Sequence, residues 1–268
     1  MKFGLKKALS SVALVGALFS ATGYAAEPAI DSILSSGELK VCFEAGYIPF
    51  EMKTKDGRFI GFDIDIAKHM ARSIDVKFVP VNTAWDGIIP ALQTGKCDII
   101  IGGMAITPQR NLKVMFADTY IEIGQTVLIK SELEDKVTSF RDLNDPKYRL
   151  ASQIGTTGAQ AAKKYFPKAT LDLFETSADA VLQVANGKAD AFVYDLPYNA
   201  LYASQHKDTV VHLDQSFTYE PLGWAIRQND PNFLNFLNNY LVQIKKDGSY
   251  DRIYDKWFKS DAWVDSIQ

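Results

Sequence analysis

The sequence predicts an α/β protein with two similar lobes, and an internal repeat is the main observation behind this prediction. In residues 88–103 and again in residues 178–195, a helical pattern ends at a glycine and is followed by a polar step and an apolar strand. The motif GKCD at 95–98 returns as GKAD at 187–190. Each copy forms the second half of a βαβ unit, and a matching first half precedes each. We therefore expect two lobes and not one long sheet.

The chain begins with the pattern of a secretory signal peptide over residues 1–26. Three lysines near the start precede an apolar run over 8–23, and small residues follow at Ala25 and Ala26. The run is too short and too rich in Ser, Gly and Ala for a membrane span, and no cysteine follows it for a lipid anchor. We expect cleavage near Ala25 or Ala26 and a soluble exported protein.

Charge and cysteine content exclude several classes of function. The formal net charge of −3 becomes −6 without the three lysines of the signal peptide, and no basic block remains, so no nucleic-acid partner is expected. Cys42 and Cys97 lie in strand-like segments of an exported chain, where they either form a disulfide or pack as buried thiols. Their spacing matches no metal or redox motif, and we expect neither a metal nor a cofactor.

The first lobe is predicted to start with a strand over 39–43 that enters a polar turn at 44–46. A helix is expected over 62–74, where Asp63 is a plausible N-terminal cap. Its apolar residues recur at helical spacing and form an ordinary core face: Phe62, Ile66, Met70 and Ile74.

Residues 83–110 predict a helix, a buried strand and then a new helix headed by Thr107 and Pro108. This places Arg110 in the first helical turn, where a cation costs about 0.3–1 kcal/mol unless an anion offsets it. A guanidinium beside free backbone N–H groups, with two glycines at 102–103, can receive a carboxylate or a phosphate. The alternative is an Arg110 that bends into solvent or pairs with a surface carboxylate.

The second lobe offers two further polar groups at strand ends. A strand over 149–152 leads to a turn and a helix, where Thr156 and Thr157 provide hydroxyl and N–H groups for an anion. A strand over 191–194 is followed by Asp195, whose carboxylate can accept an ammonium group. Taken singly, these residues are more often loop or cap residues.

Two late helices, over 232–246 and 249–259, are expected to return to the first lobe. The chain then crosses between the lobes twice, near 120–125 and near 219–223, the latter before a strand over 224–227. Two crossings make a hinge with ligand access between the lobes.

The polar groups converge on the ends of strands, where open α/β sheets bind ligands. A carboxylate held by Arg110 and by helix starts, together with an ammonium held by Asp195, is the outline of an α-amino acid. The joint placement of these groups supports a binding site more strongly than any of them does alone.

Several motifs in order carry a family resemblance: GELKVCFEAGYIPFE, GRFIGFDIDIAKHMA, WDGIIPALQTGKCDIIIGG, ITPQR, NGKADAFVYDLP and KKDGSYDRIYDKWF. Over everything after the signal peptide, the chain resembles the periplasmic solute-binding proteins of polar amino-acid ABC transporters. The resemblance implies the type II periplasmic-binding-protein fold, in which each lobe is a mixed sheet flanked by helices and two strands form the hinge. It implies a first lobe over 27–121 plus 223–268, a second lobe over 125–219, and hinge crossings at 120–125 and 219–223.

The resemblance also implies a partner and a mode of action. A monomer is expected to close on an amino acid and to deliver it to an ABC transporter permease in the inner membrane. The same two-lobed module occurs in sensory proteins, but no second span or cytoplasmic domain is apparent here.

Carried over by position, Arg110 resembles the family's α-carboxylate clamp, supported by the backbone near Gly103 and by Thr156, while Asp195 resembles its α-ammonium acceptor. Ala105 is a departure, because many relatives carry a hydroxyl or an acid there. The contact to the carboxylate at Ala105 is therefore expected to be weaker or to come from the backbone. The remaining expected ligand-binding residues line the side-chain end and the second lobe: Glu44, Tyr47, Trp85, Gln153, Thr157 and Tyr194.

A charge count favours a cationic ligand. If Asp195 neutralises the ligand ammonium and Arg110 the carboxylate, Glu44 remains uncompensated in a closing cleft, which is costly. Tyr47 and Trp85 can stack on a guanidinium or an alkyl ammonium stem for about 0.5–2 kcal/mol. We expect arginine, lysine, ornithine or histidine as the ligand. The alternatives are that Glu44 accepts from the amide of glutamine or another neutral amino acid, or that it pairs with a lysine of the protein outside the pocket.

An enzyme is the rival class of function. The sequence contains no nucleophile elbow, metal cluster or phosphate loop, and its histidines lack evident catalytic partners. Cyclohexadienyl dehydratases share the fold implied by the resemblance, but they need an acid just after the second-lobe Thr. This chain has TGAQ at 157–160 instead, which argues against dehydration.

Overall fold

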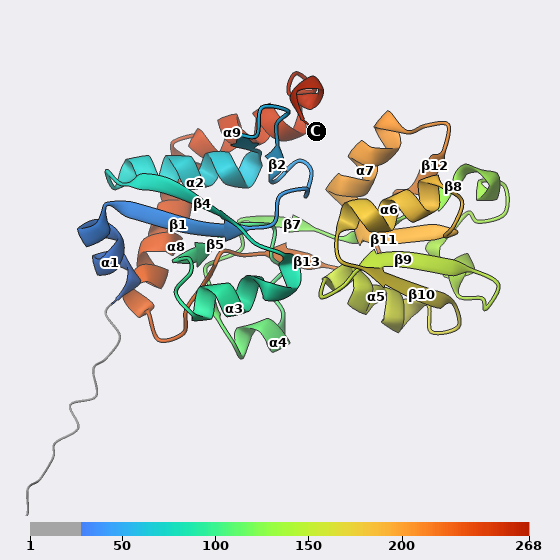
Figure 1. The fold of residues 1–268 in the computed structure, drawn as a ribbon, viewed down its shortest axis with the longest axis horizontal. Helices are drawn as coiled ribbons and strands as arrows, with labels where there is room; N and C mark the ends of the chain where they lie inside the picture. The colour runs from blue at the N-terminus through green and yellow to red at the C-terminus, as the bar shows by residue number, and fades with distance from the viewer. Residues whose placement is uncertain (1–27, 268) are drawn as a thin grey trace, which may run out of the picture.

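The computed structural model describes residues 28–267, and the predicted signal peptide lies outside this range. The described chain forms two five-stranded mixed sheets, each flanked by helices (Figure 1), which confirms the predicted α/β class. No helix within the described range is both long enough and apolar enough to span a membrane.

The first sheet combines strands from both ends of the chain. Its order is β4 (Lys77–Asn82), β1 (Glu38–Phe43), β5 (Ile99–Ile100), β14 (Ala225–Ile226) and β6 (Met115–Phe116). The first three strands run parallel, and β14 pairs antiparallel with β5 and β6. Its helices are α1 (Ala29–Ser36), α2 (Phe62–Ser73), α3 (Ile88–Gln93), α8 (Pro231–Lys246) and α9 (Ser249–Phe258). Figure 1 shows α2 and α9 on one side of β1 and α3 on the other.

The second sheet repeats this arrangement in the middle of the chain. Its order is β10 (Thr170–Phe174), β9 (Arg149–Gln153), β11 (Ala191–Asp195), β8 (Gln125–Lys130) and β12 (Val210–Leu213). Again the first three strands are parallel and the fourth pairs antiparallel with its neighbours. The helices are α5 (Thr157–Tyr165), α6 (Ser177–Ala185) and α7 (Leu196–Gln205).

The repeated Gly-Lys-x-Asp motif has the same structural role in both halves. The glycines end α3 and α6 with positive φ, 76° at Gly95 and 68° at Gly187. Asp98 Oδ2 then accepts from Lys40 N (2.9 Å), and Asp190 Oδ2 accepts from Arg149 N (2.8 Å). Each aspartate thereby accepts a hydrogen bond from a backbone N–H of the neighbouring parallel strand.

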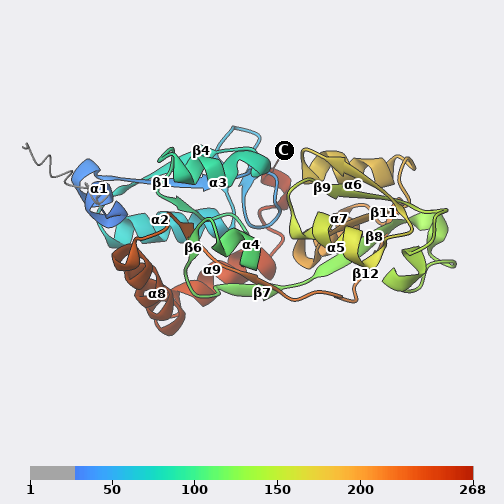
Figure 2. The same cartoon turned by 90° about the horizontal axis from the view of Figure 1, so that it is seen from below.

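Two short strands carry the chain between the sheets. β7 (Ile121–Ile123) leads from the first sheet to the second, and β13 (Glu220–Leu222) leads back. They pair antiparallel with each other (Figure 2). The remaining short elements are the β2–β3 hairpin (Met52–Lys53, Phe59–Ile60), α4 (Pro108–Asn111) and 3₁₀ turns at Trp85–Gly87, Ser131–Leu133, Phe140–Leu143 and Val264–Ser266.

The two cysteines form a disulfide, which resolves the two alternatives left by the sequence. Cys42 in β1 and Cys97 just before β5 have Cα atoms 5.7 Å apart, and both side chains are fully buried. The bond ties two neighbouring parallel strands of the first sheet near the point where the chain enters the 44–46 turn.

Two local predictions need correction. Asp63 is not a helix cap: α2 starts after Gly61 without a side-chain cap, and the Asp63 carboxyl points into the core. There it accepts from Gly103 N (2.8 Å) and Tyr120 Oη (2.9 Å), long-range partners that a local pattern cannot reveal. The strand expected over 224–227 is also shorter, because only Ala225–Ile226 pairs.

Candidate functional site

Arg110 is buried in the position predicted from the sequence. Thr107 caps α4 by accepting from Arg110 N (3.2 Å), with Pro108 at the first helical position. Because α4 has only four residues, its dipole is small, and the guanidinium itself supplies the positive charge. The residue is 8% exposed, so the alternative in which it bends into solvent is wrong.

The Arg110 guanidinium is held by carbonyl groups and by an aromatic ring. It donates to Ala105 O (2.8 Å) and to Gly155 O (3.2 Å), and it lies 5.3 Å from the ring centroid of Trp85. Burial lowers its pKa from the usual value, although the side chain of arginine stays charged at neutral pH. Among the described residues it forms no ion pair with a carboxylate.

The two threonines of the second lobe are already engaged. Thr156 caps α5 by accepting from Ala159 N (3.1 Å), and its hydroxyl donates to Gln153 O (2.7 Å). Thr157 Oγ1 accepts from Gln125 Nε2 (3.2 Å). Their first role is therefore to shape the turn that faces the pocket.

Asp195 faces the pocket from the end of β11. Its side chain does not cap α7 but accepts from Tyr47 Oη and from Gln125 Nε2 (2.5 Å). Burial is the largest effect on this carboxyl group and raises its pKa to about 7, although both hydrogen bonds and the Arg110 charge act in the opposite direction.

Glu44 accepts hydrogen bonds from both lobes. Oε1 accepts from Trp85 N (3.0 Å), and Oε2 accepts from Gln153 Nε2 (2.6 Å). Burial raises the pKa of the Glu44 carboxyl, and these hydrogen bonds partly offset the effect. Gln153 also accepts from Tyr194 Oη (3.1 Å), which fixes the orientation of its amide.

Gly103 makes room for the Tyr47 ring, and its N–H group is not free to bind a ligand. Its N–H donates to Asp63, and its backbone has φ of +61°. A Cβ at this position would lie 2.2 Å from Tyr47 Cε1, so only glycine allows the Tyr47 ring to pack here. The backbone support expected at Gly103 for a bound carboxylate is consequently not provided by its N–H.

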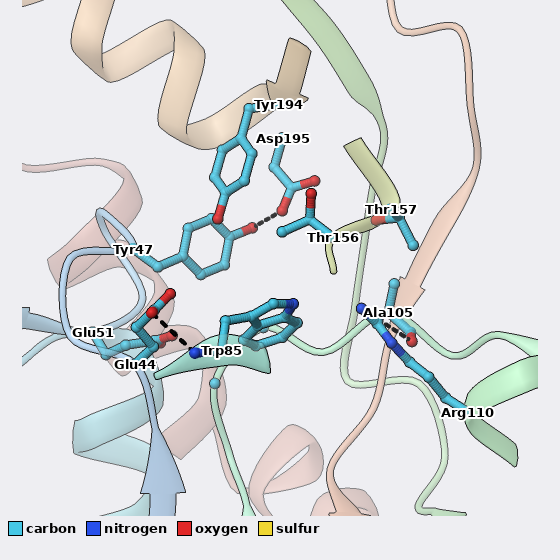
Figure 3. Close-up of a pocket in the computed structure, with 12 residues that line it drawn as sticks. Glu44, Tyr47, Glu51, Trp85, Ala105, Arg110, Thr156, Thr157, Tyr194 and Asp195 are labelled. Atoms are coloured by element: carbon cyan, nitrogen blue, oxygen red, sulfur yellow. Dashed lines mark hydrogen bonds between the residues drawn. The ribbon is translucent and has the colours of Figure 1, made fainter. Parts of the chain in front are cut away.

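The structure brings ten of the eleven predicted residues around one pocket (Figure 3). These lining residues are Glu44, Tyr47, Trp85, Gly103, Ala105, Arg110, Thr156, Thr157, Tyr194 and Asp195. Gln153 does not line the pocket, but its amide donates to Glu44 Oε2 from the second lobe. Glu51 lines the pocket and was not predicted; its sequence context, PFEMK, shows no local irregularity that would single it out.

Hydrogen bonds cross the pocket from one lobe to the other. Glu44 accepts from Gln153, Asp195 accepts from Tyr47, and Trp85 Nε1 donates to Gly155 O (3.2 Å). The lobes are thus in contact around the pocket, in a closed arrangement.

The lining has an excess of acid groups. Three carboxyl groups, those of Glu44, Glu51 and Asp195, share the lining with the single guanidinium of Arg110. Figure 3 shows Glu44 and Glu51 at one end of the pocket and Arg110 at the other, with Trp85 between them. Such an arrangement suits a ligand that has a carboxylate at one end and carries more positive than negative charge.

Comparisons with known proteins agree with this geometry. A family model described as bacterial extracellular solute-binding proteins, family 3, matches residues 39–260. The ABC transporter arginine-binding protein 1 of Escherichia coli (strain K12) is 31% identical, with 80% of this chain and 88% of that protein covered.

Two solved structures are more similar. A putative binding component of an ABC transporter from Wolinella succinogenes, complexed with lysine, is 51% identical with a TM-score of 0.83, and covers 86% of this chain and 99% of its own. An ancestral amino-acid-binding protein, described as a precursor of cyclohexadienyl dehydratase, is 52% identical with a TM-score of 0.82, with 85% and 99% covered.

Proposed function

Because this chain belongs to the bacterial extracellular solute-binding proteins of family 3, we propose that it binds a cationic L-amino acid between its lobes and delivers it to an ABC transporter. The observation that carries this proposal is the acid excess of the pocket. Glu44, Glu51 and Asp195 face one guanidinium in a buried space, and an uncompensated buried carboxylate is costly.

The ligand is placed by its charges. Its α-carboxylate binds Arg110, and its α-ammonium binds Asp195, so that the side chain extends past Trp85 toward Glu44. Charge-assisted hydrogen bonds of this kind are about twice as strong as neutral ones. The faces of Trp85 and Tyr47 suit the stem of arginine or lysine.

The relatives support the cationic class over the neutral one. The similar structure from Wolinella succinogenes contains lysine, and the Escherichia coli relative is an arginine-binding protein. A neutral side chain such as that of glutamine would leave the acid end of the pocket without a counter-charge.

Transport requires the ligand to change the balance between open and closed forms. The β7–β13 pair is the proposed hinge, and the hydrogen bonds across the pocket stabilise the closed form. A ligand shifts this balance only by its differential affinity for the two forms, and its ammonium and cationic side chain supply that difference at Asp195 and Glu44. A permease in the inner membrane then recognises the closed protein, which acts as a periplasmic monomer.

The experiment that tests this function is a ligand screen. Protein unfolded, freed of copurified ligand and refolded is tested by thermal shift and calorimetry against the twenty amino acids, ornithine and citrulline. Strong stabilisation by arginine, lysine, ornithine or histidine is expected. A response to neutral amino acids alone would retain the binding function but exclude the cationic class.

Dehydration chemistry is the second candidate, because one similar structure is described as a precursor of cyclohexadienyl dehydratase. The segment that follows Thr156 contains no acid, and we infer that the chain binds without turnover. Incubation with prephenate or arogenate should therefore yield no product, and measurable turnover would contradict this inference.

A further inference from the structure

Glu51 is a buried pocket residue whose carboxyl group lacks a counter-charge. Its N–H donates to Tyr47 O (2.9 Å) and its C=O accepts from Gly46 N (2.9 Å), so the backbone fixes the base of the side chain. The residue is only 1% exposed, yet it lines the pocket beside Glu44 (Figure 3). Glu51 therefore belongs to the end of the pocket that is opposite Arg110.

A second buried carboxyl group, that of Asp63, shares the same backbone turn. A Cβ on Gly102 would lie 3.3 Å from Glu51 Oε1, and Gly103 N donates to Asp63 Oδ2 (2.8 Å). Glu51 Oε2 and Asp63 Oδ1 are both sealed from solvent, and neither has a hydrogen-bond partner in residues 28–267. An unsatisfied buried acceptor costs about 1–3 kcal/mol, and more when it is charged.

Among the described residues, the titratable groups that act on this pair from the surrounding elements are acidic or phenolic. They are Glu44 just after β1, Asp195 at the end of β11, Tyr120 just before β7, Tyr194 in β11 and Tyr250 in α9. Burial and the neighbouring negative charges raise the pKa of Glu51 well above its usual range. The charge of Asp63 disfavours ionisation of Glu51, and two such buried carboxyl groups do not both ionise without a cation.

We propose that Glu51 and Asp63 hold one proton between them while the pocket is empty, and that Glu51 loses this proton when a cationic side chain enters. The proton passes to the solvent buffer, and the Glu51 carboxylate then faces the ligand cation. This inference rests on the proposed function and makes Glu51 a specificity-determining residue of the same site.

The selectivity for cationic over neutral ligands follows from the protonation state of Glu51 in the complex. A cationic side chain compensates the carboxylate, whereas a neutral side chain of the same shape requires the proton to stay. Glu44 already accepts one hydrogen bond at each oxygen, while Glu51 Oε2 accepts none. Arginine and citrulline differ mainly in this charge and therefore form the matched pair of probes.

Calorimetry can count the protons directly. The exported chain is titrated with arginine and with citrulline in two buffers of different ionisation enthalpy at the same neutral pH. Asp195 contributes equally to both titrations, because both ligands carry an α-ammonium. We expect more protons to be released with arginine than with citrulline, and Glu51→Gln to remove this difference. The variant should also reduce the preference for arginine over citrulline about ten-fold or more.

Glu132→Gln is the matched control, since Glu132 is an exposed residue of the 3₁₀ turn at Ser131–Leu133. It should change neither affinity nor proton release. If Glu51→Gln lowers the affinities for arginine and citrulline equally, Glu51 has a structural role and the inference is overturned. If that variant does not fold, equal proton release with both ligands in the unaltered protein overturns it as well. Absence of binding to every cationic amino acid would instead overturn the proposed function, and this inference with it.

Discussion

Arg110 and Asp195 carry opposite charges in the same pocket, but they form no ion pair within 4 Å. Arg110 donates to carbonyl groups, and Asp195 accepts from a phenol and an amide. Neither group therefore has an oppositely charged hydrogen-bond partner, which would bind it more strongly than a neutral one. The carboxylate and ammonium of one amino acid supply both partners at once, which is why the separation of these two residues favours a zwitterion.

The side-chain end of the pocket can be tested at Glu44. Glu44→Gln removes a negative charge and keeps the size of the side chain, so it should weaken arginine binding more than ten-fold, about 1.4 kcal/mol. Citrulline binding should change much less, because no cation is lost from its contact. Isothermal calorimetry on both ligands provides the measurement, with Glu132→Gln as control. An unchanged arginine affinity would exclude Glu44 as a charge partner.

Asp195 predicts a pH dependence of ligand binding. Burial raises its pKa to about 7, so below neutral pH an ammonium must displace a proton before it binds the carboxylate. The affinity for arginine should therefore increase with pH from about 5.5 to about 7.5, by up to about ten-fold per unit for each proton displaced. Asp195→Asn should weaken binding and flatten this dependence. An affinity independent of pH in this window would contradict the assignment.

At the scale of elements, the disulfide and the repeated βαβ units stabilise the sheet ends that form the pocket. Cys42 in β1 is bonded to Cys97 just before β5; Glu44 follows β1 directly, and Gly102 and Gly103 follow β5 after one residue. The crosslink therefore anchors two of the segments that position lining residues. Its absence should loosen the first lobe before it affects the second.

The contribution of the disulfide can be measured by removing it. Cys42→Ala with Cys97→Ala opens a loop with a sequence separation of 55 residues, for which chain entropy predicts a loss of about 4 kcal/mol. Denaturant unfolding of the double variant, compared with the oxidised protein, should give a loss of about 2–4 kcal/mol. Equal stability of the two proteins would show that the native bond adds no net constraint.

Local patterns in the sequence predicted the helices and strands. The roles of some buried polar residues depend on long-range contacts and could not be predicted in this way. The glycine-ended helices, the Gly-Lys-x-Asp repeat and the capped arginine at Thr107–Arg110 each depend on neighbours in the chain, and the fold contains them. Asp63 was misassigned because its partners lie 40 and 57 residues away. Glu51 was missed for the same reason, since its importance comes from Asp63 and from burial.

At the scale of the whole molecule, the excess of acidic residues in the pocket influences the balance between open and closed arrangements of the lobes. In the closure proposed above, Asp195 moves into a buried site where its pKa is about 7, so closure without ligand takes up protons above the usual pKa of an aspartate. Rising pH therefore opposes empty closure. A bound cation removes this opposition because it supplies the missing charge.

Small-angle scattering can test this coupling. The radius of gyration of the ligand-free protein should be larger at about pH 8 than at about pH 5.5, because only the acidic solution provides the protons that closure requires. Saturating arginine should abolish the difference. If the radius of gyration contracts on ligand binding but does not change with pH, closure does not depend on the protonation of the pocket and the proposed coupling is wrong.

The acidic lining of the pocket also bears on ATP consumption by the transporter. A carrier that closed readily while empty would present an ABC transporter with a docked partner and no cargo, and each such encounter would risk ATP hydrolysis without import. Near neutral pH, the need to take up a proton at Asp195 disfavours closure without a bound cation. The acidic residues proposed to select the ligand would thereby also reduce closure of the protein without ligand.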